Sequence, residues 1–358
     1  MQGAERIDYY FNKIKNKKVA LIANNTSVVK TEKGKTHIID TLLSLGISVN
    51  KIFTPEHGFL GDKDDGEKFE NTYYKNIEVI SLYGNNRKLK DDDIKNVDVI
   101  IFDIQDVGVR FYTYLSTLHY AMESAARKNK KFIIMDRANP NSFYIDGPVL
   151  DLENRSFIGL HPVPIVYGMT IGEYGLMING EGWLDNNLKV DIEVIKLKNY
   201  NHKLKYIPPI RPSPNLPNIQ SIYLYPSLAF LEKTEVSVGR GTENQFQVYG
   251  HPDFDSDYSF IPQPNFGSQY PKLEGIESYG KNLKNYKTSN SIELKWLMNS
   301  YSQIDDKTKF FRSDFDKLSG SSMLKKQIIE GVSEIEIRNS WRKGLEKFKK
   351  IRQKYLLY

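Results

Sequence analysis

Residues 99–108 read VIIFDIQDVG, four apolar side chains followed directly by acidic and amide groups. A short apolar run with such an ending is typical of a strand that is buried on both faces of a sheet. Similar apolar runs occupy residues 19–23, 79–82 and 132–135, and residues 49–53 are also strand-like. Helical spacing of apolar residues occurs between some of these runs, at residues 38–45 and 114–127. The alternation predicts an α/β fold with a Rossmann-like, doubly wound parallel sheet.

Polar residues follow four of the predicted strands. They read NNTS at 24–27, TPEHG at 54–58, DIQDVG at 103–108 and DRANP at 136–140. The carboxyl ends of parallel strands meet at one edge of a sheet, where open α/β sheets bind their ligands. We therefore expect a binding site at this edge.

The second half of the chain has a different texture. Residues 208–217 contain five prolines, which predict a stiff, extended connector. We place a Rossmann-like domain at residues 1–215 and a second, smaller α+β domain at residues 216–358. Near the end, Trp341, Leu345, Phe348, Ile351 and Tyr355 recur at spacings of three and four, which predicts a helix with one docking face.

Composition excludes several classes of function. The 358 residues carry a formal charge of +6, but the basic residues are scattered and form no nucleic-acid-binding motif. The absence of cysteine excludes disulfides and a thiol nucleophile. No dinucleotide fingerprint, phosphate-binding lysine loop, nucleophile elbow or H-E-x-x-H pattern occurs, so we expect neither a cofactor nor a metal. No apolar run reaches transmembrane length, and residues 1–18 lack the apolar stretch of a signal peptide.

Glu56 is the leading candidate for chemistry. Pro55 restricts the preceding residue to extended geometry, and Gly58 permits a sharp turn. A carboxyl group flanked by Phe53 and Phe59 can stay protonated near neutral pH, as the general acid of a glycosidase must. The alternative is a Glu that caps a helix or forms a salt bridge. His57 could position Glu56, bind a sugar hydroxyl or act as an acid or base itself.

Further candidates lie at the other strand ends. Asp103 and Asp106 could each serve as base, nucleophile, sugar-hydroxyl acceptor or helix cap, and Gln105 could bind a hydroxyl or acetamido group. An arginine fork matches a carboxylate, so an anionic ligand could be held by Arg110, Arg137, Arg211 or Arg240.

Together these segments resemble the exo-β-N-acetylmuramidase family of bacterial peptidoglycan hydrolases, long recorded as a domain of unknown function. The resembling stretches run in the family's order through most of the chain. They are FTPEHGF at 53–59, FDIQDVGVRFYTY at 102–114, DRANP at 136–140, GPVLD at 147–151, VYGMTIGE at 166–173, RPSPNLP at 211–217 and EVSVGRGT at 235–242. Two departures are Ala138, where the family usually has Pro, and residues 24–27, where it usually has Asn-Pro-Thr-Gly.

The resemblance implies an exo-acting glycoside hydrolase that releases terminal β-1,4-linked N-acetylmuramic acid from the non-reducing end of peptidoglycan fragments. It implies that residues 1–215 form the catalytic domain, that the C-terminal domain closes a cleft between the two, and that Glu56 is the catalytic glutamate. We expect His57 and Asp103 to support Glu56 in catalysis. The candidate substrate-binding residues in or beside the resembling stretches are Asn24, Gln105, Asp106, Arg110, Tyr112, Arg137, Asn139, Arg211, Ser213, Asn215 and Arg240. One arginine would hold the lactyl carboxylate of the sugar.

Several alternatives stay open at this level. The reaction could use two carboxylates, or it could use the acetamido group of the substrate in place of an enzymic nucleophile. The chain could instead be a non-catalytic muropeptide- or sugar-binding protein, or a nucleotide-dependent transferase. The resemblance implies an exported protein, periplasmic or secreted, whose targeting segment lies outside this sequence; a cytoplasmic protein is the alternative. We expect no nucleic-acid partner and no membrane insertion, and the sequence does not indicate an oligomeric state.

Overall fold

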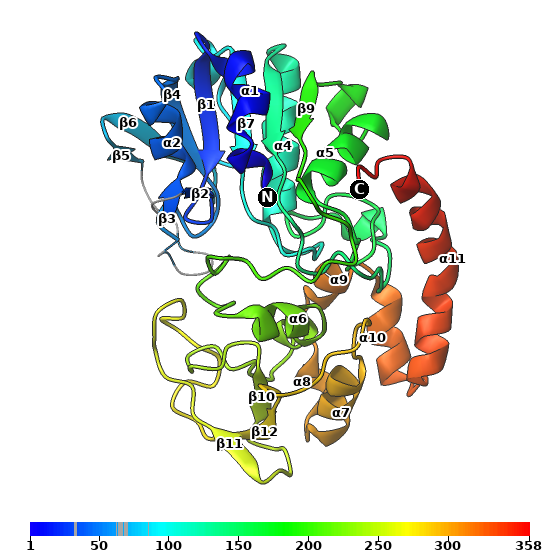
Figure 1. The fold of residues 1–358 in the computed structure, drawn as a ribbon. Coiled ribbons are helices and arrows are strands. Elements are labelled where there is room, and N and C mark those ends of the chain that lie inside the picture. Colours follow the sequence, from blue (N-terminus) through cyan, green and yellow to red (C-terminus); the bar gives the residue numbers. More distant parts are fainter. Residues whose placement is uncertain (32–33, 62, 64–66, 68–70, 85) are drawn as a thin grey trace.

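The computed structural model describes residues 1–358 except 32–33, 62, 64–66, 68–70 and 85 (Figure 1). The described residues form a seven-stranded sheet in the order β5-β6-β4-β1-β7-β8-β9. The bounds are β1 Lys18–Ala23, β4 Ser48–Thr54, β5 Thr72–Tyr74, β6 Ile77–Ser81, β7 Val99–Asp103, β8 Lys131–Met135 and β9 Ile192–Ile195. Neighbouring strands are parallel except for β5, which runs antiparallel to β6 at one edge. The predicted parallel α/β sheet is confirmed, with an antiparallel edge strand added.

Alternate residues of the central strands enter two separate apolar cores, because successive side chains of a strand point to opposite faces. From β1, Ala20 and Ile22 join the core under α4 (Tyr114–Arg127) and α5 (Ile171–Gly180). Val19 and Leu21 join the core under α1 (Ile7–Ile14) and α2 (Ile38–Ser44). Burial on both faces explains why these strands read as uninterrupted apolar runs.

Short elements complete this half of the molecule. They are η1 Gly3–Glu5, β2 Val28–Thr31, β3 Gly34–His37, α3 Asp91–Ile94, η2 Leu152–Asn154 and η3 Asp185–Asn187, with β2 and β3 paired antiparallel. The proline-rich segment then leads to the second half, and the proposed domain boundary between residues 215 and 216 falls in the coil before α6.

The second half combines helices with a three-stranded antiparallel sheet of order β10-β12-β11 (Figure 1). Its elements are α6 Ile219–Leu228, η4 Ala229–Lys233, β10 Val248–His251, β11 Tyr258–Phe260, β12 Ser278–Asn282, α7 Lys295–Gln303, α8 Lys307–Phe310, α9 Phe315–Ser319, α10 Ser322–Ile329 and α11 Glu334–Gln353. Its buried side chains continue the core beneath α4, so one apolar core joins the two halves. The predicted α+β character of this half is confirmed.

The last helix, α11, runs along one side of both halves (Figure 1). Trp341 and Phe348 are buried on it, which confirms the predicted docking face. Beyond α11 the chain contacts the first half through hydrogen bonds from the Tyr355 hydroxyl to Glu181 (2.7 Å) and from the Tyr358 hydroxyl to Asp136 (2.6 Å). None of the described helices is long and apolar enough to cross a bilayer.

Candidate active site

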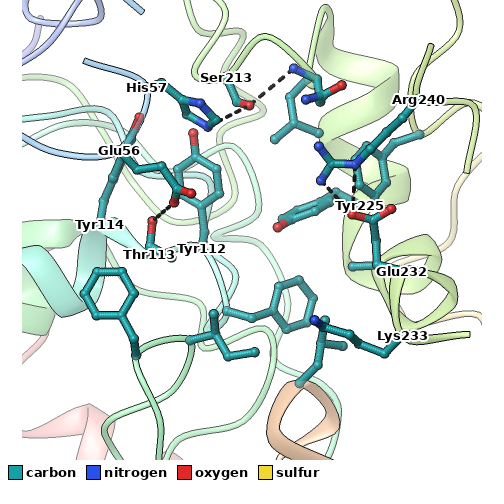
Figure 2. Close-up of a pocket in the computed structure, with 18 of the residues that line it drawn as sticks. Glu56, His57, Tyr112, Thr113, Tyr114, Ser213, Tyr225, Glu232, Lys233 and Arg240 are labelled. Carbon is teal, nitrogen blue, oxygen red and sulfur yellow. Dashed lines mark hydrogen bonds and ion pairs between the residues drawn. The ribbon is translucent and has the colours of Figure 1, made fainter. Parts of the chain in front are cut away.

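A cavity of about 310 Å³ lies where the two halves meet. The first half contributes the turn after β4, the start of α4 and part of the loop that follows η2. The proline-rich segment before the second half contributes Ser213 and Asn215, and the second half contributes α6, η4 and the loop that carries Arg240. Figure 2 shows Glu56 and His57 on one wall, with Glu232, Lys233 and Arg240 on the opposite wall.

The backbone after β4 directs Glu56 into this cavity. His57 and Gly58 both adopt left-handed conformations, with φ of 70° and 74°, so the chain turns sharply after Pro55. Glu56 is 7% exposed, and its Oε2 accepts a 2.7 Å hydrogen bond from the Thr113 hydroxyl at the start of α4 (Figure 2). This bond fixes the orientation of the carboxyl group within the cavity.

Two hydrogen bonds fix the ring of His57. Its Nδ1 lies 2.9 Å from the carbonyl oxygen of Lys63, and a carbonyl can only accept, so Nδ1 carries a proton. In the neutral ring Nε2 is then an acceptor, and it receives a hydrogen bond of 3.2 Å from the Ser213 hydroxyl (Figure 2). Ser213 in turn accepts from the backbone N–H of Asn215. The proline-rich segment therefore positions the residue next to Glu56.

The opposite wall carries paired charges. Arg240 donates to the Glu232 carboxylate from Nε (2.9 Å), and its Nη2 lies 2.6 Å from the same oxygen (Figure 2). Lys233 lies 2.6 Å from Asp314. Glu232 and Lys233 belong to the short helix η4 (Ala229–Lys233). No motif in the sequence marks this helix as part of a site.

A lysine from another loop holds η4 in place. The Lys272 ammonium donates to the backbone carbonyls of Leu231 (3.1 Å), Glu232 (3.3 Å), Thr234 (2.6 Å) and Val236 (2.9 Å). Burial lowers the pKa of Lys272 to about 8. The carbonyls at the end of a helix lack intrahelical donors, and a charged donor satisfies them.

The cavity brings together six of the fourteen residues predicted for the site: Glu56, His57, Tyr112, Ser213, Asn215 and Arg240. The other eight do not line it, and the groups that each of them contacts explain why.

Asp103 and Arg137, predicted to support catalysis and to bind substrate, are paired with each other instead. The guanidinium donates to both oxygens of the Asp103 carboxylate at 2.6 and 2.8 Å, and both side chains are buried. Such a bidentate pair satisfies both charges. We therefore assign the pair a structural role beneath the sheet edge.

Asp106, Gln105 and Asn139 shape the loops around the cavity. Asp106 accepts from the Tyr167 hydroxyl and from the Gly108 N–H, and burial raises its pKa to about 6. Gln105 donates to two backbone carbonyls at 2.8 Å. Asn139 donates to the carbonyl of Met169. These three side chains therefore lie outside the cavity lining, and their hydrogen bonds hold the neighbouring loops.

Asn24 acts one step behind the cavity wall. Its side-chain N–H donates to the hydroxyl of Tyr114 (3.0 Å), a residue that lines the cavity, and its side-chain oxygen accepts from Thr26. Asn24 therefore orients Tyr114 and is not itself in the cavity lining.

Two of the four candidate arginines lie elsewhere. The buried Arg110 guanidinium donates to the carbonyls of Pro148, Val163, Leu318 and Ser319 at 2.7–3.1 Å, which ties the loop after β7 to α9. Burial lowers its pKa to about 9. Arg211 is exposed and stacks over the Phe266 ring at 4.6 Å. With Arg137 paired to Asp103, Arg240 is the one predicted arginine in the cavity lining.

Sequence reasoning missed Thr113, Tyr114, Tyr225, Glu232 and Lys233. Thr113 and Tyr114 lie inside the stretch 102–114 that carried the resemblance, so this stretch is the signal that could have identified them as site residues. Glu232 and Lys233 lie just before the stretch at 235–242, in a segment with no turn residue or strand end to mark it.

Two family models match nearly the whole chain. The model described as "Exo-beta-N-acetylmuramidase NamZ, N-terminal" matches residues 19–220, and the corresponding C-terminal model matches residues 223–358. The chain belongs to the exo-β-N-acetylmuramidase family. The resemblance stated from the sequence is confirmed, and the family's two-part architecture agrees with the two halves of the structure.

Several known proteins are similar to this chain in sequence or in fold. A Bacillus subtilis (strain 168) protein described as peptidoglycan beta-N-acetylmuramidase NamZ is 34% identical over 376 aligned positions, which cover 98% of this chain and 89% of that protein. A crystal structure of a DUF1343 family protein from Bacteroides fragilis NCTC 9343 is 40% identical with a TM-score of 0.92, and covers 100% of this chain and 98% of its own. A second such structure from the same organism is 26% identical with a TM-score of 0.84 and the same coverage.

Proposed function

We propose that this chain is an exo-acting glycoside hydrolase that releases terminal β-1,4-linked N-acetylmuramic acid from the non-reducing end of peptidoglycan fragments. The observation that carries the proposal is the continuous family match together with a Glu56 carboxyl held inside the cavity. The named activity of the Bacillus subtilis relative, which aligns with 98% of this chain, points to the same reaction.

In this mechanism Glu56 is the general acid. Its Oε2 accepts a hydrogen bond from the Thr113 hydroxyl, which leaves Oε1 to carry the proton of the carboxylic acid. Transfer of that proton to the glycosidic oxygen, as the bond from this oxygen to the anomeric carbon breaks, lets the remaining saccharide leave as a neutral alcohol. His57, whose ring is fixed by Ser213 and the Lys63 carbonyl, orients the sugar beside Glu56.

The group that assists Glu56 by acting at the anomeric carbon has two candidates. One is Glu232, on the opposite wall, whose carboxylate accepts hydrogen bonds from Arg240. The other is the acetamido oxygen of the substrate, which would attack the anomeric carbon and require no enzymic nucleophile. Asp103 is removed from the direct chemistry by its ion pair with Arg137. A Glu232→Gln variant that keeps turnover would favour the acetamido route, and one that loses it would favour Glu232.

Arg240 is our candidate for the lactyl carboxylate of N-acetylmuramic acid. It lies in the cavity lining, and its planar fork can hold a ligand carboxylate while it stays close to Glu232. An uncharged N-acetylglucosamine, which lacks the lactyl group, would not gain this interaction.

The substrate preference supplies the test of this function. A chromogenic β-N-acetylmuramide and the matching β-N-acetylglucosaminide are offered to the purified chain, and release of the chromophore is followed. We expect cleavage of the muramide and little or none of the glucosaminide. Cleavage of the glucosaminide alone would overturn the assignment, and binding of muramic acid without hydrolysis would indicate the non-catalytic alternative.

We also propose that the protein acts outside the cytoplasm, in the periplasm or secreted, because intact peptidoglycan lies there. Fractionation of the source cells, with the protein detected by antibody, tests this. Recovery in the cytoplasmic fraction alone would show a role in degrading fragments after their import.

A further inference from the structure

A second cavity, of about 390 Å³, lies beside the hairpin formed by β2 and β3. Its other walls are the N-terminal residues around η1, Arg137 after β8, and residues 206–209, which lead into the proline-rich segment. None of the residues that line it also lines the first cavity, so the two are separate. The chemistry proposed above does not use the second cavity.

The buried Arg137 guanidinium has hydrogen-bonding capacity left over on this wall. Its side chain is 1% exposed, and its Nε and Nη2 donate to the two oxygens of Asp103 at 2.6 and 2.8 Å. Nη2 also donates to the Val28 carbonyl at 3.1 Å, so three of the five N–H groups of the guanidinium are used. The two on Nη1 have no hydrogen-bond partner among the described residues. Because Arg137 lines the cavity, these two N–H groups are available to a molecule inside it.

Two more donors lie on the same wall. The Tyr206 hydroxyl has no hydrogen-bond partner among the residues that the structure describes, and burial raises its pKa to about 12, so it keeps its proton. The side-chain oxygen of Gln2 accepts from the Ala138 N–H, which leaves the amide N–H groups of Gln2 as donors. A ligand that enters this cavity therefore meets N–H and O–H groups that require an acceptor.

The one acidic side chain in the lining is already satisfied. The two oxygens of Glu5 accept hydrogen bonds from two backbone N–H groups, at 2.7 and 3.2 Å. Against this carboxylate the lining carries the cations Arg137, Lys30 and Lys35. The excess of donors and of positive charge favours an anionic ligand over a sugar, whose hydroxyl groups would also need acceptors.

The remaining walls are apolar. Val28, Ile207 and Pro209 contribute them, from the hairpin on one side and the connecting segment on the other. The two sides are joined by a hydrogen bond from the Lys35 ammonium to the Pro209 carbonyl (3.1 Å). A volume of about 390 Å³ falls in the range of small-molecule sites, about 300–1,000 Å³. An inorganic anion would leave the apolar walls without contacts, whereas an organic acid would cover them.

We propose that the second cavity is a binding site for a small organic acid. The carboxylate of the ligand accepts hydrogen bonds from Arg137 and Tyr206, and its apolar body packs against Val28 and Ile207. Asp103 holds the guanidinium in place from the other side. The site does not depend on the proposed hydrolase function. The competing explanation is that only water ever accepts from these donors.

The test compares a carboxylate with an alcohol of the same chain length. Sodium hexanoate and 1-hexanol are titrated into the chain, and the heat of binding is measured. We expect hexanoate to bind with a Kd in about the millimolar range, and hexanol to bind at least about tenfold more weakly. Tyr206→Phe should raise the Kd of hexanoate about tenfold, the equivalent of about 1.4 kcal/mol. Tyr270→Phe removes a hydroxyl from an exposed tyrosine and is the matched control, which should bind as the wild-type chain does.

A variant with a filled cavity locates the bound acid. Val28→Phe places a ring between the walls and should abolish hexanoate binding. Binding that survives Val28→Phe would place the acid elsewhere and overturn the site, as would equal binding of hexanoate and hexanol, or an unchanged Kd in Tyr206→Phe. If circular dichroism shows that Val28→Phe is unfolded, Ile207→Asp replaces it, because a carboxylate at this exposed rim position repels the ligand. Unchanged binding by Ile207→Asp would also contradict the site.

Discussion

At the scale of single residues, the candidate site depends on a side chain held in an uncommon backbone conformation. His57 has a φ of 70°, and left-handed geometry of this kind costs a non-glycine residue about 1–3 kcal/mol. The hydrogen bond that its ring donates to the Lys63 carbonyl and the one that it accepts from Ser213 help to offset that cost. The geometry places Glu56 and His57 together on the cavity wall.

Ser213→Ala tests this arrangement. Loss of the hydroxyl leaves His57 Nε2 without its donor, and a single hydrogen bond of about 1 kcal/mol corresponds to roughly fivefold in rate. We expect kcat on the chromogenic muramide to fall about fivefold while the melting temperature changes little. Ser44→Ala removes a hydroxyl bonded to the Thr41 carbonyl, on α2, and should leave kcat unchanged. Equal kcat in the two variants would argue against a positioning role for Ser213.

At the scale of elements, Arg110 joins the halves that enclose the cavity. It follows β7 in the chain, yet its guanidinium donates to two carbonyls at the end of α9. Gly320 follows these carbonyls with a φ of 75°, and a Cβ there would lie 2.3 Å from the Arg110 Nη2. Glycine is required both by the backbone conformation and by the close approach of the arginine.

Comparison of two glycine substitutions separates these requirements. Gly331 has a similar φ of 72° with open space around its Cβ position. Gly331→Ala should therefore cost only the conformational strain, about 1–2 kcal/mol. Gly320→Ala should cost a further 1–3 kcal/mol or so, because the Arg110 pairing must shift. Urea unfolding measures both, and equal costs would show that the contact with Arg110 is unimportant.

The burial of each strand explains why some strands could be predicted from the sequence and others could not. β1, β7 and β8 have apolar neighbours on both faces, so their sequences are nearly continuous apolar runs. β4 reads SVNKIFT, and only its last residues are buried without interruption. β9 lies at the sheet edge with mostly half-buried residues, and its sequence IEVI was not recognised as a strand. β5 is three residues long and carries no apolar run.

Residues of the candidate site that lie at strand ends could be predicted from the sequence, and residues from the other half of the molecule could not. Strand ends indicated the edge of the sheet beside which Glu56 and His57 line the cavity. The same rule also selected Asp103 and Arg137, because a strand end does not show whether a side chain meets a cavity or a neighbouring charge. Glu232 comes from η4 in the other half, and its position depends on packing between the halves.

At the scale of the whole molecule, two buried carboxyl groups link stability to pH. Burial raises the pKa of Asp106 to about 6 and that of Asp136 to about 7, from an ordinary value of 3.8. Asp136 also accepts a hydrogen bond from the Tyr358 hydroxyl, and this bond joins the last residue to the first half. The folded chain keeps both protons at pH values where the unfolded chain has lost them.

Because the folded chain binds these protons more tightly than the unfolded chain, its stability should fall as pH rises. The contribution of the two groups is fully present below about pH 4 and is lost as pH rises through about 6 to 7. The free energy of unfolding should therefore fall between pH 5 and pH 8 by more in the wild-type chain than in an Asp106→Asn, Asp136→Asn double variant. Urea unfolding at the two pH values measures this difference. An identical pH dependence in both proteins would show that the two carboxyl groups are already ionised in the folded chain.

The most direct measurement is the turnover of a muramic acid disaccharide by Glu56→Gln, with Glu153→Gln at an exposed position as control. The amide keeps the shape of the side chain and can still accept from Thr113, but it has no acidic proton to give. We predict that kcat of Glu56→Gln falls about 10²–10⁴-fold while substrate binding is retained, and that kcat of Glu153→Gln is unchanged. Turnover of Glu56→Gln within a few-fold of the wild-type rate would contradict it.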